Sequence, residues 1–257
     1  SCQLGKKDEG IAFLRQAIVH GGDTDDNRIN LAKALAELGQ FDEALKACAP
    51  DGNPATPDLQ RMHAEILKLQ GRPSDALWVY ERLVYENPDD FGCWNNLGTT
   101  KLETGDLDGA LEAFQKARDL DPKSAVVHTN IARVLMAKDR YEDACLMLEK
   151  AALLNPDDPA PLVELGRTLT QIDHTEAGLR ALGAAARLNP KDPKVFIAIG
   201  LAFTDLSQQL QAERAFKFAV QADPSYPAGY LNLGVLFEKA NRTIRYNSVH
   251  RFTNDSA

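Results

Sequence analysis

The chain has 257 residues, of which 44% are hydrophobic and 26% charged, values that are ordinary for a folded protein with a sizeable core. Its formal net charge of -8 at pH 7 argues against nucleic acid or an anionic membrane surface as a partner. No apolar run approaches the roughly 18–20 residues that span a bilayer, and the first ten residues lack a stretch of signal-peptide type. We therefore expect a cytoplasmic protein with no membrane span and no nucleic-acid partner.

The four cysteines, Cys2, Cys48, Cys93 and Cys145, lie far apart in the sequence. This spacing argues against a disulfide framework and against a thiolate zinc site. We expect free thiols that act as small buried hydrophobes in a reducing compartment.

A period of 34 residues organises most of the chain. Asn-Pro or Asp-Pro dipeptides end at Pro88, Pro122, Pro156, Pro190 and Pro224. Three further series keep the same step: small residues at Ala64, Gly98, Ala132, Gly166, Gly200 and Gly234; small residues at Ala76, Ala110, Ala144, Gly178 and Ala212; and larger ones at Tyr80, Phe114, Leu148, Leu182 and Phe216. Several independent series with one period indicate a repeat architecture.

In chain order, residues 1–24 fit the second half of a repeat, and residues 25–56 form a repeat that is two residues short. Residues 57–226 hold five strict repeats, residues 227–242 resemble a first helix, and residues 243–257 form a degenerate tail or cap. Because the chain starts and stops inside a repeat, we expect a fragment of a longer protein. Apolar residues at the cut ends then favour self-association or a capping role for the tail. We do not expect glycosylation at the triplets beginning with Asn241 and Asn254.

One repeat, "WNNLGTTKLETGDLDGALEAFQKARDLDP", shows the physical logic of the unit. Apolar residues at helical spacing predict two amphipathic helices, one on each side of Gly105. Gly105 is suited to the left-handed conformation that ends a helix, and Asp106 to capping the next. Gly98 and Ala110 allow the two helix backbones to approach closely. Neither helix buries its apolar stripe alone, so neighbouring units must stack.

This motif resembles the tetratricopeptide repeat, with Trp, Leu-Gly, Gly, Ala, Phe, Ala and Pro at nearly every position of that family's pattern. The resemblance covers residues 57–226. It implies an all-α fold, a right-handed superhelical solenoid of antiparallel helix pairs. It also implies a non-catalytic scaffold that binds a protein or peptide segment in a concave groove.

Reactive groups do not converge anywhere in the sequence. The histidines are scattered, and His63 stands where other repeats have Leu97 and Ile131, which indicates a core-edge position. We expect no catalytic residue, no metal site and no cofactor. The alternative is a substrate-recruiting repeat module of a larger, bacterial enzyme, such as a sulfotransferase or glycosyltransferase, whose catalytic domain lies outside these residues.

The candidate binding residues belong to the first helices, which line the groove in a stacked array. Two positions before the small residue of each first helix stand Asn30, Met62, Asn96, Asn130, Glu164, Ala198 and Asn232. An asparagine ladder can hold an extended peptide backbone, as the family does ahead of an O-linked sugar transferase domain. The alternative is that the four asparagines, Asn30, Asn96, Asn130 and Asn232, follow the repeat consensus and bond to a neighbouring helix.

Arg133 and Arg167 occupy equivalent positions three residues further along two successive first helices. Together they could receive an acidic segment through charge-assisted hydrogen bonds. The alternative is that Glu164 pairs with Arg167 across one helical turn and that both guanidinium groups stay solvated.

Overall fold

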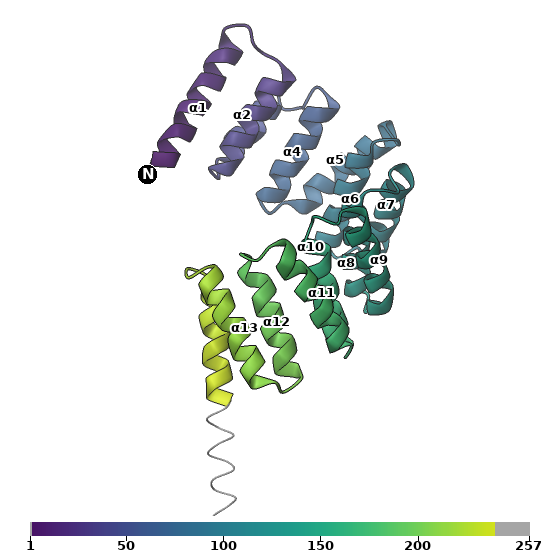
Figure 1. Cartoon of the computed structure of the whole chain (residues 1–257). Helices are drawn as coiled ribbons and strands as arrows, with labels where there is room; N and C mark the ends of the chain where they lie inside the picture. The colour runs from purple at the N-terminus through teal and green to yellow at the C-terminus, as the bar shows by residue number, and fades with distance from the viewer. Residues whose placement is uncertain (1, 240–257) are drawn as a thin grey trace, which may run out of the picture. The chain divides into compact units, whose positions relative to one another are not determined.

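The computed structural model describes residues 2–239, which are helical apart from the connecting turns (Figure 1). The tail at 243–257 and the triplets at Asn241 and Asn254 lie outside the described residues. Two compact units are present, one ending at Lys123 and the other starting at Ser124.

The first unit holds seven helices among its described residues. They are α1 (Cys2–Val19), α2 (Asp25–Glu37), α3 (Phe41–Cys48), α4 (Pro57–Leu69), α5 (Pro73–Glu86), α6 (Phe91–Glu103) and α7 (Leu107–Leu120). Each helix packs against the next one in the chain, and α2 also packs against α4. A helix therefore contacts both its hairpin partner and the neighbouring pair, which is the packing of a helical solenoid.

The second unit continues the same pattern. Its helices are α8 (Ala125–Ala137), α9 (Tyr141–Leu154), α10 (Ala160–Gln171), α11 (Thr175–Leu188), α12 (Pro193–Asp205) and α13 (Gln209–Ala222), followed by helical residues 227–239. Sequential helices pack together, and α10 also packs against α12. The predicted all-α class and the helix pairs are confirmed, while the proposed repeat boundaries remain a prediction.

The turn within each helix pair has the predicted chemistry. Gly105 has a φ of 85°, and the backbone N–H of Gly109 donates to the Asp106 carboxylate over 2.9 Å. The equivalent positions in the second unit are Asp139, Asp173 and Ser207, with φ values of 56°, 61° and 60°. The left-handed conformation therefore persists where glycine is absent, because the hairpin geometry demands it.

Close approach of the two helices of a pair depends on the small residues. A Cβ at Gly98 would lie 2.7 Å from the buried ring of Phe114. A Cβ at Gly166 would lie 2.9 Å from the backbone oxygen of Gly178 on the facing helix. The small and large series found in the sequence thus form the interlocked core of each hairpin.

Candidate functional site

The face that the sequence predicts to bind a partner lies on the first helix of each pair. In the first unit these helices are α2, α4 and α6, which carry Asn30, Met62 and Asn96. In the second unit α8, α10 and α12 carry Asn130, Glu164 and Ala198, and Asn232 follows in residues 227–239. We call this set the groove row. Its members range from exposed Asn30 to buried Met62 and Ala198.

The four asparagines of the groove row differ in how they are bonded. Asn232 donates its side-chain amide to the carbonyl of Ala228 in its own helix over 2.7 Å. The Asn130 amide oxygen accepts from Arg133 over 3.5 Å, again within one helix. The side chains of Asn30 and Asn96 make no hydrogen bond within residues 2–239, so these two amides are available to a ligand.

Arg133 is held by a carboxylate on the next first helix. Its Nε donates to Glu164 Oε1 over 3.1 Å and its Nη2 donates to the same oxygen over 2.5 Å, which joins α8 to α10. The alternative in which Glu164 pairs with Arg167 is therefore not what the structure shows, since Glu164 pairs with Arg133. The Glu164 side chain reaches across to α8, where its carboxylate accepts from two nitrogens of the Arg133 guanidinium group. The planar guanidinium group suits such paired hydrogen bonds.

Arg167, in contrast, is exposed and has no hydrogen-bond or ion-pair partner among the described residues. It stands at a pocket of about 240 Å³ between α10 and α12. Gln171 and Asp205 line the same pocket beside the apolar side chains of Ala198 and Leu201. The unpaired guanidinium of Arg167 and the carboxylate of Asp205, next to an apolar strip, suit the backbone and alternating side chains of an extended peptide. The sequence singled out Arg167 but missed Gln171 and Asp205.

Cys48, Cys93 and Cys145 are buried thiols of low reactivity. Burial raises the pKa of the Cys48 thiol to about 12, and burial with the nearby Asp90 carboxylate raises that of Cys93 to about 11. Burial also raises the pKa of the Cys145 thiol. Because a thiolate is the reactive form, these three residues fit the predicted packing role.

No group of three or more His, Cys, Asp or Glu side chains in the described part of the chain is placed to hold a metal ion. His63 is half-buried on α4, and burial, together with Arg72, lowers the pKa of its imidazole. Of the helices in residues 2–239, none combines the length and apolar character that a membrane crossing needs.

Comparisons with known proteins agree with this architecture. Residues 101–145 match the family model of the tetratricopeptide repeat. Superkiller complex protein 3 of Homo sapiens is 31% identical over 74 residues, a match that spans 29% of this chain and only 5% of that protein.

Two solved structures resemble the chain closely in fold. The Cut9–Hcn1 hetero-tetramer of the APC/C has a TM-score of 0.69 at 15% identity, covering 90% of this chain and 46% of the other. A tetratricopeptide repeat protein from Parabacteroides merdae ATCC 43184 also has a TM-score of 0.69, at 14% identity, covering 92% and 94%.

The helix pairs, their interlocked small residues and their stacking define an all-α repeat fold. Residues 101–145 match the tetratricopeptide repeat, and the described helices share the fold of a solved tetratricopeptide repeat protein.

Proposed function

We propose that the first-helix face binds an extended segment of a partner protein without catalysing a reaction. The single observation that carries this proposal is Arg167, an exposed and unpaired cation at the pocket between α10 and α12. Around it, the Asp205 carboxylate offers acceptors and Leu201 offers an apolar contact.

The selectivity of this face follows from which charges are already paired. Arg133 is occupied by Glu164, so it does not share a ligand carboxylate equally with Arg167. Arg167 is therefore the proposed selector of an acidic side chain. Asp205 in the same pocket disfavours a dense run of acidic residues, since like charges repel. The preferred ligand is an extended segment with one carboxylate opposite Arg167.

A peptide library displayed on phage tests this proposal. Arg167→Glu is compared with Arg180→Glu, which changes an exposed arginine of α11 that also has no partner among the described residues. A charge-assisted hydrogen bond contributes about 1.5–3 kcal/mol, so Arg167→Glu should weaken selected peptides by roughly tenfold or more. Arg180→Glu should leave the affinity unchanged.

Three results would contradict the proposal: no enrichment, equal losses in both variants, or binding indifferent to Arg167→Glu. Asn130→Ala is a further comparison within the second unit, because it removes an amide already bonded to Arg133 in its own helix.

Self-association through the last helical residues is a second property that we propose for the same chain. Leu231 and Phe237 are exposed by 67% and 46%, while Leu236 is buried against Phe216. Sedimentation equilibrium should therefore show a dimer that Leu231→Glu/Phe237→Glu dissociates. A wild-type monomer at every concentration would rule it out.

A further inference from the structure

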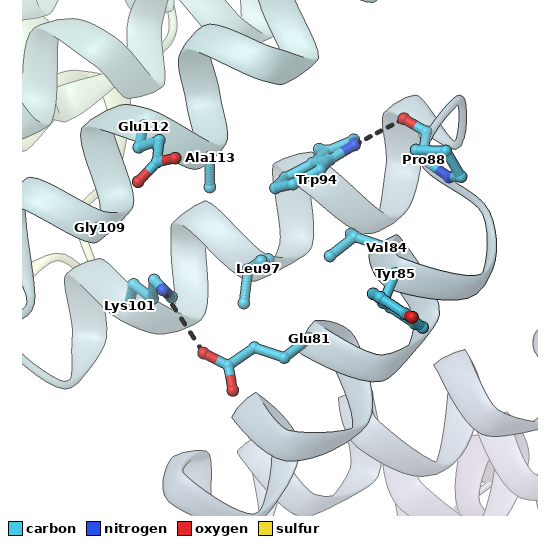
Figure 2. A pocket seen from close by; sticks show the side chains of 10 residues that line it. All are labelled: Glu81, Val84, Tyr85, Pro88, Trp94, Leu97, Lys101, Gly109, Glu112 and Ala113. Atoms are coloured by element: carbon cyan, nitrogen blue, oxygen red, sulfur yellow. Dashed lines mark hydrogen bonds and ion pairs between the residues drawn. The ribbon is translucent and has the colours of Figure 1, made fainter.

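A pocket of about 450 Å³ lies between α5, α6 and α7 of the first unit (Figure 2). Its floor is apolar, formed by the buried side chains of Val84, Leu97 and Ala113. None of its lining residues belongs to the groove row. It is therefore a surface separate from the one to which the proposed function is assigned.

Two aromatic rings line one side of this pocket. The Trp94 indole N–H donates to the backbone oxygen of Pro88 over 2.8 Å, which fixes the orientation of that ring. Tyr85, which also lines the pocket, is 87% exposed. On the same helix the Arg82 guanidinium lies 4.9 Å from the centroid of the Trp78 ring, so a cation already stacks on an aromatic nearby. Such faces attract cations through the quadrupole of the ring.

The charges of the pocket leave a carboxylate unmatched. The Lys101 ammonium lies 3.5 Å from Glu81 and 3.7 Å from Asp106, so it is engaged by two acids. Gly109 leaves room for this arrangement, because a Cβ there would lie 2.9 Å from Lys101 Cδ. Glu112, across the pocket from Trp94 in Figure 2, has no hydrogen-bond or ion-pair partner within residues 2–239. With Glu81, Glu112 and Lys101 as its charged lining, the pocket carries a net negative charge.

The second unit has a pocket at the equivalent position of the repeat, with a volume of about 220 Å³. Phe196, Ile199 and Ala215 line it, each three periods of 34 residues after Trp94, Leu97 and Ala113. The position of Glu112 is taken there by Arg214. The pockets at this position of the repeat thus have an aromatic and aliphatic lining in both units, while the charge at the rim changes from that of Glu112 to that of Arg214. Lys101 and Gly109 are also replaced there, by Phe203 and Gln211, so the two pockets suit ligands of different charge.

We propose that the pocket between α5 and α7 binds a lysine or arginine side chain of a partner protein. The aliphatic stem lies along Leu97 and Val84, as the stems of long basic side chains do on apolar surface. The cationic group meets the Glu112 carboxylate, and the rings of Trp94 and Tyr85 line the other side of the pocket. A negative rim on an apolar, aromatic pocket is complementary to this side chain and to no acidic one.

The test uses Trp94 as its reporter, since the chain holds only two tryptophans. In a Trp78→Phe background the remaining indole is that of Trp94, and its ¹H–¹⁵N signal and fluorescence report on the pocket alone. Capped pentapeptides of glycine with arginine, lysine, norleucine or glutamate at the centre are titrated in. We expect saturable changes with arginine and lysine, a response at least about fivefold weaker with norleucine, and none with glutamate.

Two substitutions locate the charge. Glu112→Arg, which introduces the residue of the equivalent pocket, should abolish the response to the arginine peptide, and Glu112→Gln should weaken it about tenfold. Glu176→Arg on α11 is the matched control, because Glu176 is exposed and unpaired among the described residues, and it should change nothing. Both Glu112 variants should fold, since the side chain is exposed.

The proposal is overturned by no response to arginine, by equal responses to arginine and norleucine, or by equal effects of Glu112→Arg and Glu176→Arg. Arg167→Glu should leave this binding intact. Loss of the groove site and loss of this pocket are therefore distinguishable.

Discussion

Gly200 is the position at which the packing of a helix pair is tested most sharply. A Cβ there would lie 2.3 Å from Cε1 and 2.5 Å from Cδ1 of Phe216. That ring is buried and cannot swing into solvent, so Gly200→Ala forces α12 and α13 apart or pushes Phe216 off its rotamer. Overpacking of this kind costs about 1–3 kcal/mol. The gain in helix propensity from glycine to alanine, about 1 kcal/mol, offsets part of it.

Gly183→Ala supplies the matched comparison. Gly183 lies within α11, and the atom nearest to a Cβ added there is a side-chain nitrogen of Arg187 at 3.9 Å. Gly183→Ala gains the helix propensity of alanine without the clash. The difference in the free energy of unfolding between the two variants therefore isolates a packing cost of about 1–3 kcal/mol. Urea unfolding followed by far-UV circular dichroism measures it. If Gly200→Ala were as stable as Gly183→Ala, the interlocked packing of glycine and phenylalanine would be refuted.

Three further predictions concern the turns, the thiols and a cap. Gly105→Ala should lower the free energy of unfolding by about 1 kcal/mol and Ser207→Gly should raise it, since both positions have positive φ; thermal melts of the two variants check this. The raised pKa values of Cys48 and Cys93 predict a free energy of unfolding that is unaffected below about pH 9. It should fall as the pH rises from about 9 through about 11 and about 12, because only the unfolded thiols ionise in that window. A urea midpoint that stays constant over this pH range would refute the prediction. Asp90→Ala should lower the free energy of unfolding by about 1–2 kcal/mol, because it removes the hydrogen bond from the Cys93 N–H over 2.9 Å and the ion pair with Arg61 at 3.1 Å. An unchanged chemical-denaturation midpoint would contradict this.

The features that were predictable from the sequence are those fixed by the backbone. A left-handed residue must end the first helix of each hairpin, and Gly105 satisfies that need by its residue type alone. The predicted cap at Asp106 and the close approach at Gly98 follow in the same way. A period that repeats these residues predicts the hairpin and its core together.

Features that depend on long side chains were not predictable. Glu164 lies within reach of guanidinium groups on two helices, and the structure selects Arg133 rather than Arg167. Spacing along one helix cannot decide between these partners, because both are compatible with the same backbone. The carboxylate of Glu112 and the opening beside it likewise depend on which neighbouring side chains leave space.

The division at Lys123 was also absent from the prediction. The 34-residue period continues through Pro122 without interruption, so the sequence offers no boundary signal there.

Chemical-shift mapping of a selected peptide on the ¹⁵N-labelled chain shows directly whether the first-helix face binds it. We expect the largest shifts on this face in the second unit, at Arg167, Gln171 and Leu201, and we expect them to vanish with Arg167→Glu. Shifts confined to the second helices α9, α11 and α13, or none at all with a peptide that binds, would contradict this expectation.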